Sequence, residues 1–177
     1  MKKLEQGFTQ IYTGNGKGKT TAAIGLAVRA TGSGLKTYII QFMKDFPYGE
    51  LNSLNHLSEW ITIEKVGKDD YVFRKEPPPK EEIEKAKLAL EKAKQKMLSG
   101  DYDLIILDEI CVAIYFGLFP VDEVLLFLDA KPDNIELILT GRYCPQSLIE
   151  RADLVTEMKE VKHYYQKGIL SRKGIES

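Results

Sequence analysis

The chain has 177 residues, of which 44% are hydrophobic and 29% are charged, with a formal net charge of −1. This length suffices for one compact domain with a sizeable core, and the near-neutral charge argues against nucleic acid as a main partner, because binding to a phosphate backbone depends on clustered Lys and Arg. No apolar run is long enough for a membrane span, and no apolar signal-peptide segment follows the basic N-terminus. The two cysteines lie far apart in the sequence, which is typical of reduced thiols. We therefore expect a cytoplasmic protein.

A short β-prone run, residues 8–12, predicts a first strand that is buried and central. It leads into the loop Thr13-Gly14-Asn15-Gly16-Lys17-Gly18-Lys19-Thr20-Thr21, and an alanine-rich run predicts a helix over 19–31. This order is typical of a phosphate-binding loop, in which backbone N–H groups and a helix N-terminus surround an anion. Thr13 replaces the usual first glycine. The alternative is a glycine-rich hairpin with an accidental Lys-Thr, which the flanking strand and helix disfavour.

The next elements build the framework of an α/β domain. The helix over 19–31 is apolar nearly all round, so we expect it to be covered on several sides. A second strand is predicted over 36–42, and the loop that follows lies at its carboxyl end, where ligands bind in open α/β sheets. A short helix over 51–57 and a strand over 60–66 come next.

The middle of the chain contains a loop and a long helix. Residues 67–79 combine charges, aromatic residues and three prolines, which predicts either a flap over a ligand or a plain connection. Residues 80–99 carry apolar side chains at alternating spacings of three and four, which predicts an amphipathic helix. Covering the sheet is the simplest role for its apolar stripe, and packing on a partner subunit is the alternative.

Two later strands end in residues suited to phosphate chemistry. The strand predicted over 102–109 ends in Asp108 and Glu109, which after a phosphate-binding loop are expected to hold Mg²⁺ or to orient its water molecules. The strand predicted over 135–140 is followed by Gly141 and Arg142. Arg142 is expected to neutralise charge on the phosphates in the transition state, and a surface arginine that caps a neighbouring helix is the alternative.

The remaining segments complete a single domain. Helical or short apolar pieces are expected over 112–117 and 121–128, a short helix over 145–151 and a last strand over 154–158. His163 alone is more often structural than catalytic. We found no repeat and no second domain, so residues 1–177 are expected to form one P-loop nucleotide-binding domain.

Together these segments resemble the corrinoid adenosyltransferases of the CobA/BtuR type. The resemblance covers nearly the whole chain in the right order and includes the unusual Thr13. It rests on the following stretches: Tyr12 to Ala23, Gln41-Phe42-Met43-Lys44, Leu107-Asp108-Glu109, Thr140-Gly141-Arg142, Val155 to Lys159, Lys162-His163, Gly168 and Gly174-Ile175-Glu176.

The resemblance implies a reaction and a fold. The 5′-deoxyadenosyl group of ATP would pass to the cobalt of cob(I)alamin or a related corrinoid of cobinamide type, with release of triphosphate. It implies a RecA-like P-loop fold, a mostly parallel sheet with helices on both faces, dependence on Mg²⁺ or Mn²⁺, a flavoprotein or other reductant for cobalt, and a homodimer. ATP would lie in the loop in a reversed sense compared with ordinary nucleotidases.

The resemblance also implies roles for single residues. Catalysis would depend on Lys19, Glu109 and Arg142, and the metal would be held by Thr20, Asp108 and Glu109. ATP would be bound by Arg142 and by the loop residues Gly14, Asn15, Gly16, Lys17, Gly18, Lys19, Thr20 and Thr21. The family commonly has a Gly-Phe-Thr-Trp segment after the third strand, whereas this chain has Gly67-Lys68-Asp69-Asp70-Tyr71-Val72-Phe73, so Tyr71 and Phe73 are expected on the corrinoid side.

This chemistry fits the residues present. Co(I) is already a strong nucleophile, so the protein has to stabilise the leaving triphosphate rather than to supply a base. Two other functions are considered: a P-loop kinase or ATPase, which would release ADP and usually needs a base for an acceptor hydroxyl, and a nucleotide-binding or corrinoid-delivery protein without turnover.

Overall fold

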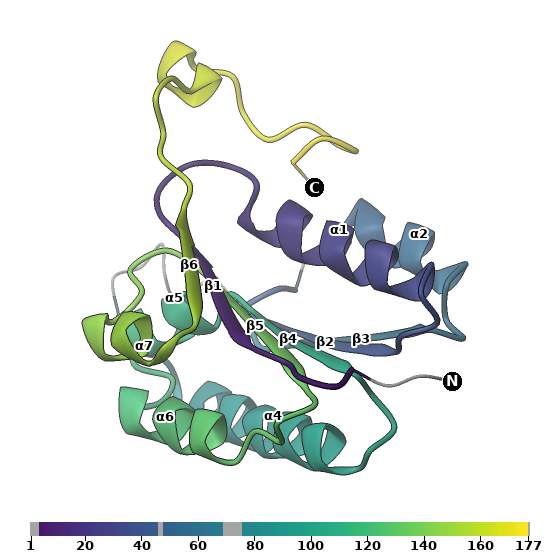
Figure 1. Ribbon diagram of the computed structural model, residues 1–177. Helices are drawn as coiled ribbons and strands as arrows, with labels where there is room; N and C mark the ends of the chain where they lie inside the picture. The colour runs from purple at the N-terminus through teal and green to yellow at the C-terminus, as the bar shows by residue number, and fades with distance from the viewer. Residues whose placement is uncertain (1–3, 46–47, 69–75, 177) are drawn as a thin grey trace.

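A computed structural model describes residues 4–45, 48–68 and 76–176 (Figure 1). In chain order its elements are β1 (Thr9–Thr13), α1 (Lys19–Thr31), β2 (Thr37–Phe42), α2 (Gly49–Asn55), β3 (Ile61–Val66), α4 (Lys80–Leu98), β4 (Leu104–Asp108), α5 (Ile110–Tyr115), α6 (Val121–Asp129), β5 (Glu136–Thr140), α7 (Gln146–Arg151), β6 (Leu154–Glu157) and the short 3₁₀ helix η1 (Tyr164–Lys167). The predicted strands and helices are confirmed, and the predicted ends differ from the observed ends by no more than two residues.

The six strands form one sheet in the order β3-β2-β4-β5-β1-β6. Every neighbouring pair is parallel, so all six carboxyl ends lie at the same edge, where α/β folds bind their ligands. The first strand is interior, as predicted, but it is not central. It lies between β5 and the edge strand β6.

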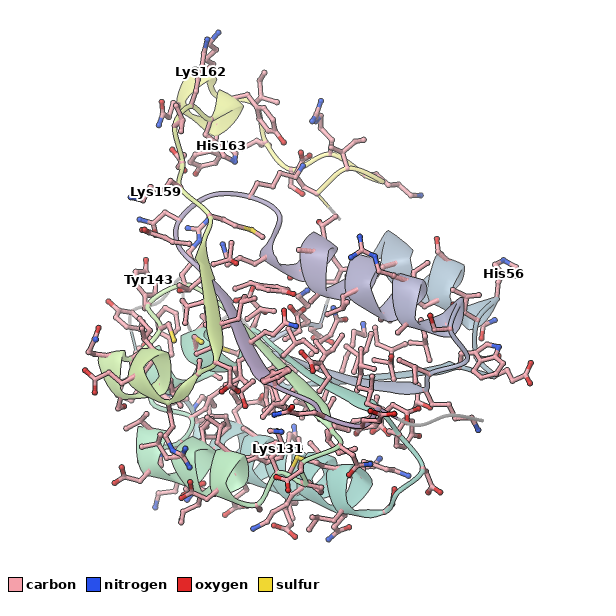
Figure 2. All side chains as sticks on the ribbon, in the orientation of Figure 1. His56, Lys131, Tyr143, Lys159, Lys162 and His163 are labelled. Atoms are coloured by element: carbon pink, nitrogen blue, oxygen red, sulfur yellow. The ribbon has the colours of Figure 1, made fainter. Side chains whose placement is uncertain are left out.

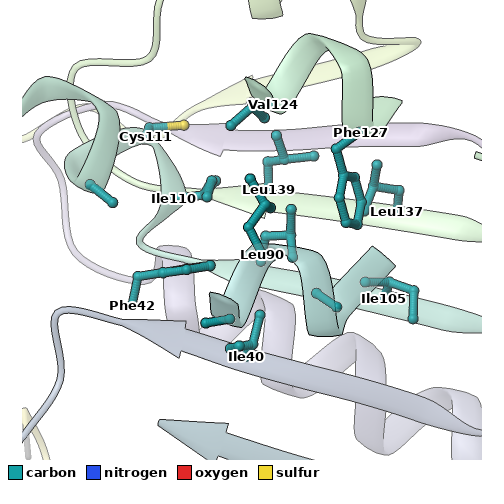
Figure 3. Close-up of a cluster of buried hydrophobic side chains, with 14 of the residues drawn as sticks. Ile40, Phe42, Leu90, Ile105, Ile110, Cys111, Val124, Phe127, Leu137 and Leu139 are labelled. Carbon is teal, nitrogen blue, oxygen red and sulfur yellow. The ribbon is translucent and has the colours of Figure 1, made fainter. Parts of the chain in front are cut away.

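Helices cover both faces of the sheet, α1 and α2 on one and α4 and α6 on the other (Figure 1). The alternation of side chains along each strand divides the core between the two faces. In β4, Leu104 and Ile106 pack on the face of α1, whereas Ile105 and Leu107 pack on the face of α4. Figure 3 shows the part of the core between the sheet and α4, where Leu90 of α4 lies over the sheet.

The predicted amphipathic helix is confirmed as α4. Ala86, Leu90, Ala93 and Met97 are buried against the sheet. Leu88, on the same helix, is 72% exposed.

The prediction that helix α1 is covered on several sides is wrong for the described chain. Its buried side chains are Lys19, Ala23, Ala27 and Ala30, which recur at intervals of three or four and so form a single face. Val28 on the outer surface is 43% exposed. The small alanines allow α1 to lie close to the sheet. The larger side chains of Ile24 and Leu26 are only partly buried. Across the described ranges, no helix combines the length and apolar character that a membrane crossing requires.

Candidate nucleotide site

The loop between β1 and α1 is closed around the ammonium group of Lys19. Its Nζ donates hydrogen bonds of 2.8 Å to the carbonyl oxygens of Gly14 and Gly16, and the residue is only 7% exposed. Burial lowers the pKa of Lys19, and the neighbouring acids Glu109 and Asp108 partly oppose that shift. A largely buried cation therefore lies in the loop, with Glu109, Arg142 and Asp108 as its charged neighbours, and is suited to meet an anion there.

Two glycines of this loop are required by the chain that follows β6. The Gly16 N–H donates to the carbonyl oxygen of Met158 at 2.6 Å. A Cβ atom on Gly16 would lie 2.7 Å from that oxygen, and one on Gly14 would lie 2.5 Å from it. Gly14 also has a φ of 95°, which residues with a side chain rarely adopt. The spacing of glycines thus reflects packing between the loop and the C-terminal segment.

Asp108, at the end of β4, joins three neighbouring elements through its carboxylate. Oδ1 accepts hydrogen bonds from the hydroxyls of Thr20, at 2.9 Å, and Thr140, at 2.6 Å. Oδ2 accepts from Gln41 at 3.0 Å and from Lys44 Nζ at 2.8 Å. Asp108 is 1% exposed. This carboxylate fixes the Thr20 hydroxyl beneath the loop.

Lys44 supplies the charge that balances Asp108. It lies two residues after the end of β2 and is 8% exposed. Burial alone would lower the pKa of Lys44, but the contact with Asp108 and the nearby Glu109 and Glu50 outweigh it and raise the pKa. Gln41 and Lys44 belong to a stretch of the family resemblance, but no role was predicted for them, because their contacts with Asp108 depend on the order of the strands.

Glu109 has a strained backbone that turns it away from β4. Its φ is 61°, and its N–H donates to the Thr140 hydroxyl at 2.9 Å. Burial raises the pKa of Glu109, and repulsion from Asp108 adds to the shift, while Lys44, Lys19 and Arg142 oppose it. A carboxylate in these surroundings gains from a further cation, so its position suits a divalent metal ion.

A cleft of about 290 Å³ lies over the loop. Eight residues that the sequence analysis proposed for nucleotide, catalysis or metal line it together: Gly16, Lys17, Gly18, Lys19, Thr20, Thr21, Glu109 and Arg142. Arg142 is exposed and reaches the cleft from the carboxyl end of β5. Gly14 and Asn15 belong to the loop but do not line the cleft, and Asp108 is buried rather than part of the lining. Tyr71 and Phe73, expected on the corrinoid side, lie outside the described residues.

The C-terminal segment forms another wall of this cleft. His163, Ile175 and Glu176 line it, and the segment passes above the loop in Figure 2, where His163 is labelled. Lys17 Nζ donates to Glu176 at 2.7 Å and to the Tyr164 hydroxyl at 3.1 Å. The family resemblance includes His163 and Glu176, but the sequence analysis assigned them no role at the site. Because His163 and Glu176 lie more than 100 residues after the loop, the sequence did not indicate that they border the same cleft.

His163 was expected to be structural, and one of its nitrogens has a structural contact. Nδ1 accepts a hydrogen bond of 3.0 Å from the Tyr165 N–H at the start of η1. The residue nevertheless borders the cleft, so His163 both caps the N-terminus of η1 and contributes to the wall.

The two cysteines are distant in sequence but adjacent in the fold. Both are free, and the interaction with the neighbouring Cys144, together with burial, raises the pKa of the Cys111 thiol. Cys111 lies on α5 and Cys144 follows Arg142 by two residues. Gly141 packs on the same helix, since a Cβ atom there would lie 2.9 Å from that of Cys111. The segment that carries Arg142 is therefore held against α5.

Known proteins resemble this chain over nearly its whole length. The family described as "ATP:corrinoid adenosyltransferase BtuR/CobO/CobP" matches residues 5–177. A corrinoid adenosyltransferase from Salmonella typhimurium is 34% identical over 97% of this chain and 86% of its own length. One from Pseudomonas aeruginosa is 35% identical over 97% of this chain and 84% of its own.

Solved structures share the fold at lower identity. The flagellar accessory protein FlaH from Methanocaldococcus jannaschii superposes with a TM-score of 0.58 at 16% identity, over 87% of this chain and 72% of that one. A KaiC-like protein from Pyrococcus horikoshii gives 0.57 at 18% identity, over 98% of this chain and 77% of that one. These likenesses support the RecA-like P-loop fold alone.

Proposed function

Because the chain belongs to the ATP:corrinoid adenosyltransferase family BtuR/CobO/CobP, we propose that it transfers the 5′-deoxyadenosyl group of ATP to the cobalt of cob(I)alamin or a related corrinoid. Triphosphate is the leaving group. The observation that carries the proposal for this chain is the meeting of Lys19, Thr20, Glu109 and Arg142 in one cleft at the carboxyl edge of a parallel sheet.

The triphosphate is proposed to lie in the loop. Backbone N–H groups from Gly14 to Thr21 and the N-terminus of α1 bind its oxygens, and Lys19 leaves the loop carbonyls to contact phosphate. Lys17 and Arg142 add positive charge from the two sides of the cleft. The hydrogen bonds of Lys19 to Gly14 and Gly16 support this arrangement, because they hold the ammonium where phosphate oxygens would arrive.

A divalent ion, Mg²⁺ or Mn²⁺, is proposed beside Thr20 and Glu109. Within the described ranges no group of three His, Cys, Asp or Glu side chains forms a metal cage, and Mg²⁺ at nucleotide sites typically takes much of its coordination from phosphates and water. The raised pKa of Glu109, due first to burial, supports a nearby cation. Asp108 is proposed to act by holding the Thr20 hydroxyl and by orienting metal-bound water. When bound, the ion supplies charge to the leaving triphosphate.

The reaction needs no protein nucleophile. The electron pair on Co(I) forms the new bond to C5′ of ATP while the bond between C5′ and the triphosphate oxygen breaks, and that electron pair leaves with triphosphate. The task of Lys19 and Arg142 is to stabilise the negative charge that grows on the leaving group. The cleft walls from the C-terminal segment are proposed to limit water near C5′.

Further partners follow from this chemistry. Cobalt must be delivered as Co(I), so a flavoprotein or another electron donor is required. A homodimer is proposed, and the exposed apolar side chains of Val28, Leu154 and Val155 on α1 and the edge strand β6 support an interface. A cytoplasmic location is proposed, since free thiols and a reduced corrinoid both suit a reducing compartment.

Product analysis tests the proposal. ATP with chemically reduced cobalamin should give light-sensitive adenosylcobalamin and triphosphate, with no triphosphate when cobalamin is omitted. Release of ADP and phosphate would favour the P-loop kinase or ATPase, and binding of ATP without turnover would favour a delivery protein.

A further inference from the structure

Two tyrosines stack on the surface next to the segment that carries Arg142. The ring centroids of Tyr115 and Tyr143 are 4.1 Å apart with an angle of 25° between the planes. The rings belong to residues that are 59% and 51% exposed. Phe116 meets Tyr115 edge to face, with centroids 5.1 Å apart. We call Tyr115, Phe116 and Tyr143 the aromatic patch. Exposed aromatic rings that stack on one another offer a broad, preformed apolar surface.

The aromatic patch is continuous with the proposed nucleotide site. Tyr143 directly follows Arg142, which lines the cleft, and Tyr115 ends the helix that begins after Glu109, another lining residue. Both segments leave the carboxyl ends of β4 and β5, which are neighbouring strands. Figure 2 shows Tyr143 at this edge of the sheet, on the same side as His163 and Lys159.

Strained backbone is concentrated at the same edge. In the described chain, the residues other than glycine with positive φ are Met43, Glu109 and Tyr143, at 55°, 61° and 59°. They follow the ends of β2, β4 and β5, three adjacent strands. A tyrosine in this conformation is unfavourable compared with glycine, and such strain is common where a side chain has to be presented to a ligand.

The segments that carry the two tyrosines are held together without the rings. Gly141, which lies two residues before Tyr143, packs directly on α5, since a Cβ atom there would lie 2.9 Å from that of Cys111 and 3.0 Å from the backbone nitrogen of Val112. The stacked rings are therefore not needed to join α5 to the loop. Their exposure leaves them available for a ligand.

On the proposed function, we infer that the aromatic patch binds the flat face of the corrin macrocycle. A corrin presents a wide apolar ring, which matches the apolar faces of the stacked aromatic side chains. Its cobalt has to reach C5′ of a nucleotide that lies against Lys19 and Arg142. A surface that begins one residue after Arg142 is in position to orient that approach. The patch would thus determine affinity for the corrinoid and leave affinity for ATP unchanged.

Two substitutions test the inference without loss of the fold. Tyr143→Gly removes a ring and at the same time relieves the positive φ, so its free energy of unfolding should not fall. Tyr115→Ala removes the other ring from an exposed position. Tyr143→Phe keeps the ring, and Leu88→Ala, a substitution of an exposed residue on α4, is the matched control for loss of surface apolar area.

The assay titrates cob(I)alamin at saturating ATP, and then ATP at saturating cob(I)alamin, for each protein. Tyr143→Gly and Tyr115→Ala should each raise KM for cob(I)alamin about tenfold and leave KM for ATP within about twofold. Tyr143→Phe and Leu88→Ala should match the unsubstituted protein. Equilibrium dialysis with hydroxocobalamin in the presence of ATP should show the same order of affinities without turnover.

Three results would overturn the inference. One is an unchanged KM for cob(I)alamin in both ring-removing variants. A second is a rise in KM for ATP alone, which would assign the rings to the nucleobase. A third is dissociation of a dimer in the same variants, which would assign the patch to an interface. If the unsubstituted protein forms no adenosylcobalamin, the proposed function itself fails, so the two failures are distinguishable.

Discussion

Replacing Asp108 by alanine should cost the protein much of its stability, because the buried ammonium of Lys44 loses its nearer carboxylate and keeps only that of Glu50, 3.9 Å away. Lys44 is 8% exposed and lies 2.8 Å from the Asp108 carboxylate. Removal of one member of such a pair typically costs about 3–5 kcal/mol, and three further donors, from Thr20, Gln41 and Thr140, lose their acceptor. For a chain of this size that loss corresponds to a decrease in Tm of about 10 °C.

Urea denaturation of the protein without ligand measures this effect. Asp129→Ala is the matched control, because the ion pair of Asp129 with Arg151 is more than half exposed on both sides and should contribute under about 1 kcal/mol. The double variant Asp108→Ala with Lys44→Met should be more stable than Asp108→Ala alone, since the buried ammonium that has lost its nearer carboxylate is gone. If Asp108→Ala lost no more stability than Asp129→Ala, the account of Asp108 as the residue that joins the loop to the sheet would be refuted.

Four further predictions concern turnover and the loop. Lys19→Ala should lower kcat/KM at least about tenfold, equivalent to about 1.4 kcal/mol of transition-state stabilisation, and an unchanged value in the folded variant would exclude the lysine from catalysis. Arg142→Ala should lower kcat by about the same factor, whereas the control Arg151→Ala should leave kcat unchanged. Equal rates for these two variants would count against a role of Arg142 in neutralising the charge of the triphosphate. Removal of divalent ions with EDTA should abolish turnover, and activity in EDTA would contradict the proposed metal site. Glu109→Gln should raise the Mg²⁺ concentration that is needed for the half-maximal rate. Gly16→Ala should weaken ATP binding measured by calorimetry, because a Cβ would lie 2.7 Å from a backbone oxygen after β6.

The parts of the site that depend on local sequence could be predicted. A strand, a glycine-rich loop and a helix follow one another directly, so the positions of Lys19 and Thr20 follow from the local pattern of residues. The acids after β4 and Arg142 after β5 could be assigned to the same edge, because parallel strands bring their carboxyl ends together. Lys19, Thr20, Glu109 and Arg142 do line one cleft.

Contacts that depend on strand order and on the return of the chain could not be predicted. Lys44 and Gln41 reach Asp108 only because β2 is the neighbour of β4. Glu176 reaches Lys17 across 159 positions of sequence, and Tyr143 stacks on Tyr115 because the loop after β5 meets the end of α5. None of these pairs has a spacing or a composition that marks it in the sequence.

The outward face of α1 shows the limit of reading burial from composition. Its apolar residues predicted cover on several sides, but Val28 is exposed in the described chain. Alanine-rich helices owe their composition to close packing on one face as much as to burial all round, and composition alone does not separate the two. The position of β1 beside the edge strand β6 was also not predicted, because a local pattern of residues does not determine the order of the strands in a sheet.

The most direct test of the central claim follows both ends of the same ATP molecule. ATP that carries one radiolabel in the adenosine and a second in the γ-phosphate is incubated with the protein and cob(I)alamin, and the products are separated by chromatography. The account predicts that the adenosine label moves to cobalamin while the γ label stays in intact triphosphate, in equal amounts. Recovery of the adenosine label in ADP and of the γ label in phosphate or in a phosphorylated acceptor would contradict it.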